Sequence, residues 1–177
     1  MKRALVLISV LAGGATVAAA QSEVIREEVP GIRNLARIET TVACAGAITP
    51  ESVTGIKEMG FVSIINLREA SEPGADIDAE AAAARAAGVN YVHVPFNGSS
   101  PETSAVDRFV EAISEPANEP AFIHCSGGNR AASMWFVKRA LVDEWEVDRA
   151  MAEAAELGFR SESLKAFMTE YVETHRR

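Results

Sequence analysis

Residues 121–130, Ala-Phe-Ile-His-Cys-Ser-Gly-Gly-Asn-Arg, join a short apolar run to a loop that contains two glycines. We expect the run to form a strand and a helix to begin near Arg130. A cysteine at such a junction faces backbone N–H groups and the positive end of a helix dipole, and both favour the thiolate. The same amides form a nest for an oxyanion, and the guanidinium of Arg130 adds donors in a planar fork. The stretch therefore predicts a reaction centre with Cys125 as its nucleophile.

The other residues of this loop have supporting parts in the prediction. Ser126, Gly127, Gly128 and Asn129 act through their backbone amides, which makes their side chains secondary. His124 has two open interpretations. It is either a catalytic residue that donates hydrogen bonds, holds the loop and lowers the pKa of the Cys125 thiol, or a buried histidine at a strand end with a packing role only.

Strand and helix patterns alternate on both sides of the loop. We predict strands at residues 36–45, 61–67, 89–96 and 121–124, and helices at 50–59, 78–87, 101–113, 130–141, 146–157 and 162–175. This alternation predicts a single α/β domain whose central sheet is mainly parallel and flanked by helices. Ligands bind beyond the carboxyl ends of the strands in such folds. We therefore expect the loops at residues 66–68, 97–100 and 125–130 to converge, and Asn97 to be one of the substrate-binding residues there.

The chain resembles a known group of enzymes at several of these places. Cysteine-dependent tyrosine and dual-specificity phosphatases carry His-Cys, five residues, and Arg followed by Ser or Thr. Here four residues separate Cys125 from Arg130, and Ala131 replaces the hydroxyl residue. Together with Ile-Asn-Leu-Arg at 65–68 and Tyr-Val-His-Val-Pro at 91–95, the loop resembles a bacterial phosphatase-like family related to the beta-lactamase hydrolase-like phosphatase domain. The resemblance covers about residues 40–160.

The resemblance implies a phosphatase in which Cys125 attacks phosphorus while Arg130 and the loop amides stabilise the charged oxygens. It implies no metal and no organic cofactor. The family's usual general acid is an aspartate, and Asn97 stands at the matching position. This replacement favours substrates with good leaving groups, such as aryl phosphates. Arg68 has two open interpretations, a second anion contact or an ion pair with Glu69, Glu72 or another acid.

Two other functions remain open from the sequence. Rhodanese sulfurtransferases also use a four-residue interval, so Cys125 could carry a persulfide instead of a phosphoryl group. The replacements at Asn97 and Ala131 would also suit an anion-binding module that has lost turnover. We rank the exported phosphatase first, the sulfurtransferase second and the binding module third.

The first 20 residues predict the compartment. Lys2 and Arg3 precede an apolar run that ends in three alanines before Gln21, the pattern of a secretory signal peptide cut after Ala20. We therefore expect a periplasmic or secreted protein without stable membrane insertion. Residues 21–35 are expected to be a loose lead-in, and residues 36–177 to form the phosphatase-like domain.

The charge of the chain limits its partners. The full chain has a formal net charge of −8, and without the two basic residues of the predicted signal peptide it becomes more acidic. Such a chain is a poor candidate for nucleic-acid binding, which needs a basic face. The expected partner is a phosphate-bearing or other small oxyanion substrate that is recognised locally.

The histidines and the second cysteine add two smaller predictions. Three scattered histidines predict no metal site. Cys44 is interpreted either as a buried apolar residue or as a redox partner of Cys125.

Overall fold

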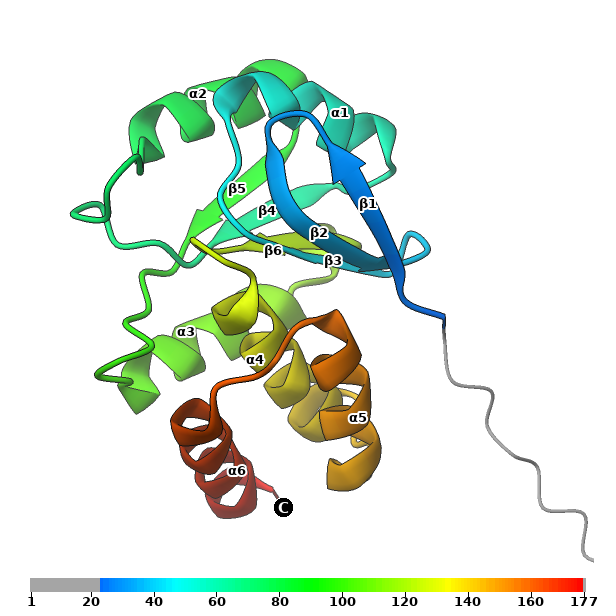
Figure 1. Cartoon of the computed structure of the whole chain (residues 1–177), viewed down its shortest axis with the longest axis vertical. Helices are drawn as coiled ribbons and strands as arrows, with labels where there is room; N and C mark the ends of the chain where they lie inside the picture. The colour runs from blue at the N-terminus through cyan, green and yellow to red at the C-terminus, as the bar shows by residue number, and fades with distance from the viewer. Residues whose placement is uncertain (1–22, 177) are drawn as a thin grey trace, which may run out of the picture.

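A twisted sheet lies at the centre of the computed structural model, which describes residues 23–176 (Figure 1). The predicted signal peptide, residues 1–20, lies outside the described residues. The strands are β1 (Ile25–Val29), β2 (Ile32–Ile38), β3 (Val42–Ala45), β4 (Ser63–Asn66), β5 (Asn90–His93) and β6 (Ala121–His124). Their order across the sheet is β1-β2-β3-β6-β4-β5.

Four neighbouring strands of this sheet, β3, β6, β4 and β5, run parallel to one another. Their registers pair Ala45 with His124, His124 with Asn66, and Asn66 with His93. The four strands therefore end level, and the segments that follow them emerge at one edge. This is the edge at which ligands bind in parallel α/β sheets.

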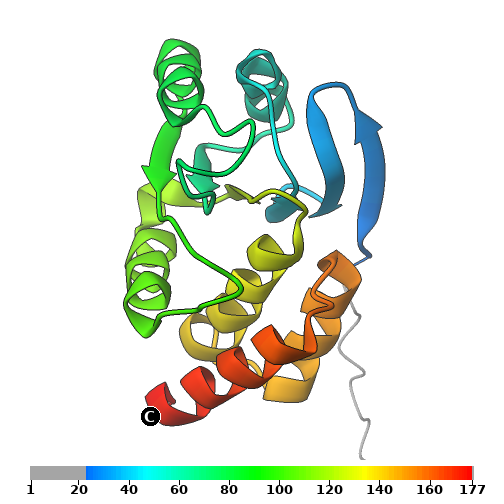
Figure 2. The same ribbon diagram turned by 60° about the vertical axis from the view of Figure 1, so that its left-hand side comes forward.

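Helices cover both faces of the sheet. They are α1 (Val53–Glu58), α2 (Ile77–Ala87), α3 (Thr103–Ser114), α4 (Asn129–Val137), α5 (Val147–Leu157) and α6 (Glu162–His175). Helices α1 and α2 lie on one face, and α3 to α6 lie on the other (Figures 1 and 2). The predicted class, a single α/β domain with a mainly parallel central sheet between helices, is confirmed.

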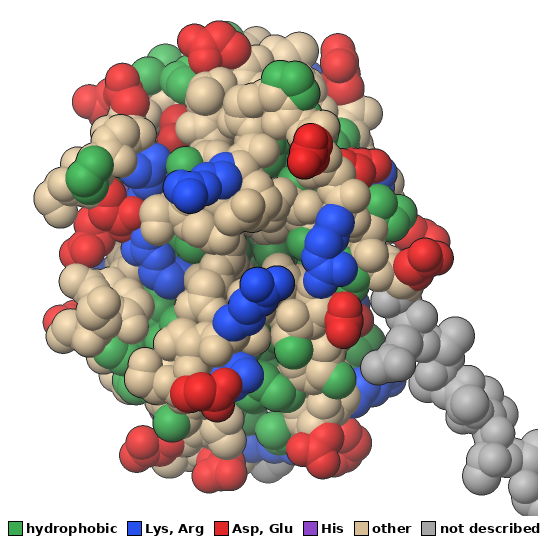
Figure 3. Space-filling view, viewed as in Figure 1, with side chains coloured by type: hydrophobic (Ala, Val, Ile, Leu, Met, Phe, Trp, Pro, Cys, Tyr) green, Lys and Arg blue, Asp and Glu red, His purple; other side chains and the backbone are tan. Residues whose placement is uncertain are grey.

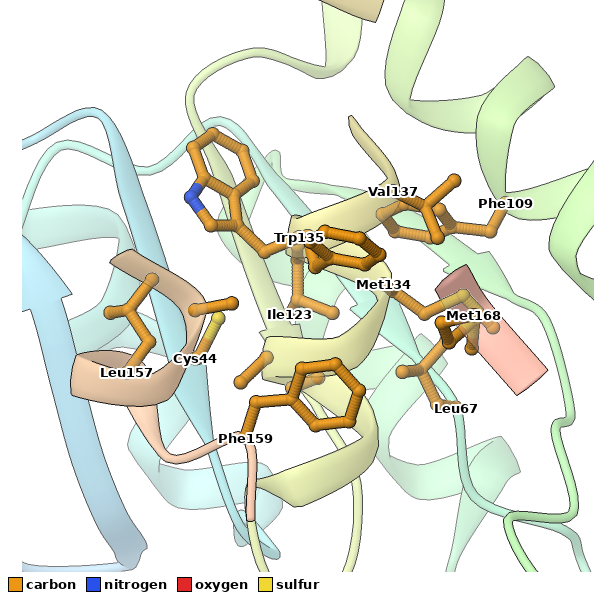
Figure 4. Close-up of a cluster of buried hydrophobic side chains, with 14 of the residues drawn as sticks. Cys44, Leu67, Phe109, Ile123, Met134, Trp135, Val137, Leu157, Phe159 and Met168 are labelled. Atoms are coloured by element: carbon orange, nitrogen blue, oxygen red, sulfur yellow. The ribbon is translucent and has the colours of Figure 1, made fainter. Parts of the chain in front are cut away.

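Helix α4 is the buried centre of the larger helical layer. Figure 4 shows side chains of α4 between the sheet and the surrounding helices, among them Met134, Trp135 and Val137. These three side chains are at most 1% exposed. Full burial of an apolar side chain of this size contributes about 1.5–3 kcal/mol. The helix that follows the Cys125 loop is therefore a fixed support for it.

The N-terminal part of the fold differs from the prediction. Residues 36–45 do not form one strand, because a turn at residues 39–41 separates β2 from the antiparallel β3. The apolar alternation continues across this turn, which explains the error. The predicted lead-in, residues 21–35, is also wrong from residue 25 onwards, because residues 25–35 belong to the β1–β2 hairpin, which turns at Gly31 with a φ of +79°. The Pro-Gly pair at residues 30–31 is the turn signal that the prediction passed over.

The remaining helices and strands lie close to their expected positions. Strand β6 matches the prediction, α2 ends at Gly88 in the left-handed conformation, and α6 spans Glu162–His175 as expected. The predicted helix at residues 130–141 is α4 continued by a π-helical turn at Lys138–Val142. No helix within residues 23–176 is long and apolar enough to cross a membrane.

Candidate active site

The Cys125 loop begins where β6 ends and leads directly into α4. The Cys125 N–H donates to the carbonyl of Ala45 (3.1 Å), which extends the pairing of β6 with β3 by one residue. The thiol is 1% exposed, and the Gly128 N–H donates to its sulfur at 3.1 Å. Gly128 has a φ of +100°, a conformation that glycine adopts without strain. The sulfur is thus held by a backbone amide at the N-terminus of a buried helix.

A second segment presses against the loop at Gly46. A Cβ atom at Gly46 would lie 3.0 Å from the carbonyl oxygens of both Arg33 and Ser126. The Ala47 N–H also donates to the Ser126 carbonyl at 3.2 Å. The absence of a side chain at residue 46 therefore lets the segment after β3 support the loop from one side.

The Arg130 guanidinium joins the three loops that were expected to converge. Its Nη1 donates to the carbonyls of Phe96 (2.7 Å) and Leu67 (3.2 Å), which follow β5 and β4. Nη1 and Nη2 also donate to the two carboxylate oxygens of Glu72, at 2.7 and 2.8 Å. Nη2 reaches the Ser126 hydroxyl at 3.1 Å. The predicted convergence of these loops is therefore confirmed.

Glu72 is a residue of this site that the sequence did not reveal as a partner of Arg130. Burial raises the pKa of its carboxyl. Hydrogen bonds from Arg130 and the Glu69 amide, together with the charges of Arg130 and Arg68, lower this pKa by more than burial raises it. The net pKa lies below its ordinary value, so Glu72 is an anion at neutral pH. Burial lowers the pKa of Arg130, yet the bond to Glu72 and the negative charge of a Cys125 thiolate raise it overall.

The ion pair with Glu72 leaves the Nε side of the Arg130 guanidinium available for an anion. Glu72 takes the two terminal nitrogens end-on, and Nε has no hydrogen-bond partner among the described residues. Nε and Nη2 form the other donor edge of a guanidinium, which matches two oxygens of a phosphate. The Ser126 hydroxyl accepts from Nη2 on that edge, and the Cys125 sulfur also interacts with the guanidinium. The arrangement therefore offers a bidentate anion contact close to Cys125.

Arg68 supports the loop that carries Glu72. It is 2% exposed, donates to the carbonyls of Pro73 (2.7 Å) and Gly74 (2.9 Å), and lies 3.5 Å from the Glu72 carboxylate. Of the two interpretations, the ion pair is the one that the structure contains. With its three nitrogens turned to this loop, Arg68 is not placed as a second anion contact.

A buried polar cluster lies on the opposite face of the sheet, beneath the loop. The His124 imidazole is fully buried, and its Nε2 is 3.3 Å from a carboxylate oxygen of Glu80, which is itself 1% exposed. The same oxygen accepts hydrogen bonds from Asn66 Nδ2 (2.8 Å) and the Tyr91 hydroxyl (2.9 Å). Asn66 in turn accepts the Arg68 N–H at 2.7 Å. The cluster therefore joins α2 to two of the converging strand ends.

The structure places His124 away from the anion loop. Neither ring nitrogen forms a hydrogen bond of good geometry, and the ring contacts Glu80 rather than the loop amides. Burial is the main cause that raises the pKa of Tyr91, so its hydroxyl remains a donor to Glu80. A direct part for His124 in catalysis stays a prediction, and its observed contacts are structural.

Two asparagines use their side chains to shape the surroundings. The exposed Asn97 accepts the N–H groups of Ser99 (2.9 Å) and Ser100 (3.2 Å), which fixes its own turn. Asn129 accepts the N–H groups of Arg160 (2.7 Å) and Ser161 (3.1 Å). Its side chain is therefore not secondary, because it ties the Cys125 loop to the α5–α6 turn. A part for Asn97 in substrate binding stays a prediction.

The two acids that follow Asn97 first in the sequence, Glu102 and Asp107, are the remaining candidates for a general acid, and the structure gives neither a place in the loops. The Asp107 carboxylate accepts a hydrogen bond from the Tyr171 hydroxyl at 2.6 Å, and Glu102 is the exposed residue that precedes α3.

Both cysteines are free thiols, and burial raises the pKa of Cys44 well above its ordinary value. Cys44 is thus a neutral core residue. Within residues 23–176 no group of three His, Cys, Asp or Glu side chains is arranged to hold a metal ion.

Comparison with known proteins identifies the family. The profile of the beta-lactamase hydrolase-like protein, phosphatase-like domain, matches residues 34–142. A beta-lactamase hydrolase-like protein of Agrobacterium fabrum is 34% identical over 107 residues, which are 59% of this chain and 25% of that protein. The chain thus spans about a quarter of the length of this relative.

Solved structures share the fold. A DUF442 protein from Shewanella putrefaciens superimposes with a TM-score of 0.69 at 21% identity, covering 83% of this chain and 96% of that one. Pseudomonas aeruginosa TpbA gives a TM-score of 0.62 at 20% identity, covering 86% and 90%. The family expected from the loop and the two strand segments is confirmed, and this chain belongs to the phosphatase-like domain family of the beta-lactamase hydrolase-like proteins.

Proposed function

We propose that the protein is a cysteine-dependent phosphatase that cleaves phosphomonoesters through a phosphocysteine intermediate. The observation that carries the proposal is the position of the Arg130 guanidinium beside a cysteine at a helix N-terminus. Glu72 and two loop carbonyls hold this guanidinium and leave its Nε without a hydrogen-bond partner among the described residues. Nucleophile and anion contact therefore belong to one rigid site. The family supports the same reaction class.

In the first step the Cys125 thiolate attacks phosphorus, the S–P bond forms, and the bond from phosphorus to the ester oxygen breaks. The leaving oxygen takes the electron pair of that bond. In the second step water attacks phosphorus, loses a proton to solvent, and the S–P bond breaks to release phosphate and the thiolate. Arg130 and the loop amides stabilise the phosphoryl oxygens in both steps because they are donors fixed before the reaction.

The leaving group of the phosphate ester decides whether aryl or alkyl phosphates are hydrolysed faster. A general acid is typically worth about 10²–10⁴ in rate, and Asn97 supplies none at the position expected for it. Phenolate needs less help than alkoxide, so we expect aryl phosphates to be the better substrates. TpbA, which shares the fold, has been crystallised in complex with phosphotyrosine, an ester of this kind. The predicted signal peptide adds the proposal that this reaction takes place in the periplasm or outside the cell.

The test is an assay of purified, reduced protein with 4-nitrophenyl phosphate, and separately with thiosulfate plus cyanide. We expect phosphate release that Cys125→Ser abolishes, and no thiocyanate. Cysteine-dependent thiocyanate without phosphate release would identify a sulfurtransferase instead. Binding of phosphate without either reaction would reduce the site to an anion-binding module.

A further inference from the structure

A groove adjoins the Cys125 loop on the side away from Glu72. It lies between the β1–β2 hairpin and the turn that joins α5 to α6, and it has a volume of about 1210 Å³. Residues of three segments line it, among them Arg26, Asn34, Gly127, Asn129 and Arg160. Figure 2 shows the hairpin and the α5–α6 turn facing each other across the end of the loop. Because residues 127–129 of the Cys125 loop form part of its lining, a molecule in the groove lies directly beside that loop.

Both walls of this groove are fixed to the catalytic loop by asparagine side chains. On the hairpin wall, Asn34 Nδ2 donates to the Gly127 carbonyl at 3.1 Å. On the helical wall, Asn129 Oδ1 accepts the N–H groups of Arg160 and Ser161. Asn34 takes a φ of +50° to do so, a conformation that asparagine tolerates better than most residues. The walls therefore keep a set position relative to Cys125.

The charges of the groove favour an anion near Arg160. Its side chain is exposed, and no carboxylate lies within 4.0 Å of its guanidinium among residues 23–176. Arg26 shares the groove but forms an exposed ion pair with Glu156 at 3.6 Å. Of the two acids of the groove, Glu27 is gripped by Arg37 at 2.8 Å, and Glu28 remains exposed.

The same distribution is visible on the molecular surface. Figure 3 shows Lys and Arg side chains gathered around the middle of this face, with most acidic side chains towards its margin. The chain as a whole is acidic, so its general field opposes an anionic ligand. The attraction therefore has to be local, and Arg160 is the arginine of this groove that has no ion pair among residues 23–176.

We propose that this groove is a substrate subsite in which Arg160 binds a second anionic group, a phosphate or a carboxylate, on the part of the substrate that is not hydrolysed. The proposal rests on the proposed function, since it assigns the reacting phosphate to the Cys125 nest. It narrows the substrate class to phosphomonoesters with two separated anionic groups. An exposed arginine contributes modestly, so we expect a gain in affinity of about 3- to 20-fold.

The test compares two series of ligands by titration calorimetry on the reduced full-length protein. One series consists of alkylphosphonates, and the other of α,ω-alkane bisphosphonates with the same chain lengths. At one or more lengths the bisphosphonate should bind at least about threefold more tightly than its matched monophosphonate. Arg160→Gln should remove this advantage and leave the affinity for the monophosphonate unchanged. Arg160→Lys should retain part of it.

Arg108→Gln is the matched control, because Arg108 is an exposed arginine on α3 without an ion pair among the described residues. It should keep the full bisphosphonate advantage. The subsite is overturned if no bisphosphonate gains over its monophosphonate, if Arg160→Gln keeps the gain, or if that variant weakens both series equally. The last result would mean that the turn acts only through the Cys125 loop.

The phosphatase assay separates this proposal from the one on which it rests. Hydrolysis of 4-nitrophenyl phosphate without any bisphosphonate advantage would leave the phosphatase and remove the subsite. An Arg160-dependent advantage without hydrolysis would leave the subsite and remove the phosphatase. If neither series binds, both proposals are wrong.

Discussion

Replacing Glu72 by glutamine tests whether this carboxylate positions Arg130 or competes with the substrate for it. The variant replaces two charge-assisted hydrogen bonds, of 2.7 and 2.8 Å, by at most one neutral bond to the amide oxygen, and Arg130 keeps Leu67, Phe96 and Ser126 as acceptors. Hydrogen bonds to charged groups contribute about 1.5–3 kcal/mol each. The expected loss of free energy is smaller than this sum for two reasons. Arg130 keeps its other acceptors, and the side chains of Arg130 and Glu72 are 12% and 18% exposed, so solvent screens part of their interaction.

We therefore expect Glu72→Gln to cost about 1.5–2.5 kcal/mol in transition-state stabilisation, a fall in kcat/KM of roughly 10- to 70-fold. The assay is hydrolysis of 4-nitrophenyl phosphate together with calorimetric titration of inorganic phosphate. Glu69→Gln is the matched control, because Glu69 is on the same loop and its side chain makes no ion pair among the described residues. Its kcat/KM should stay within about twofold of the wild-type value.

The opposite outcome would refute this reasoning. If Glu72→Gln binds phosphate more tightly and turns over faster, the carboxylate occupies the donors that the substrate needs. Glu72 would then be an internal competitor, and the free Nε edge of Arg130 would not be the anion contact.

Three further predictions follow from the same structure. Asn97→Asp should speed the hydrolysis of alkyl phosphates about tenfold or more, and that of aryl phosphates less, because only poor leaving groups need the added acid; equal gains in a paired rate comparison would contradict this. Glu80→Gln should lower the unfolding free energy by about 1–3 kcal/mol and the Tm by roughly 3–10 °C, since it weakens the acceptor of a buried cluster; unchanged thermal unfolding would be the contrary result. Because the pKa of Glu72 is lowered from 4.5, its contribution to stability should be complete above about pH 5 and disappear as the pH falls below 4.5. Urea unfolding of wild type and Glu72→Gln at several pH values measures it, and a difference that grows towards low pH would contradict the assigned charge.

The sequence predicted those parts of the fold that leave a local pattern. Strand β6, the left-handed end of α2 at Gly88 and the bounds of α6 follow from apolar periodicity and from turn residues. The hairpin was missed because its strands are polar on one side and its turn lies in a stretch with many charges. The alternation from Ile38 to Cys44 also crosses a turn without a visible break.

The candidate site shows the same division. Cys125 and Arg130 are close in the sequence, and the shape of their loop follows from the residues between them. Glu72 is 58 positions from Arg130, and Glu80 is 44 positions from His124, so only the folded sheet brings these pairs together. The contact of Asn129 with the α5–α6 turn has no local signature either, because an asparagine at a helix start is ordinarily read as a cap.

The β1–β2 hairpin has a practical consequence for how the protein is produced. Arg26 and Glu27 stand at the very start of the described chain and already line the groove beside the Cys125 loop. An affinity tag or fusion partner joined just ahead of Val24 would begin next to that groove and could exclude large ligands while sparing small chromogenic ones. The other end of the chain follows α6, whose last turn lies at the far end of the helical layer (Figure 1). Tags for ligand screening therefore belong after α6.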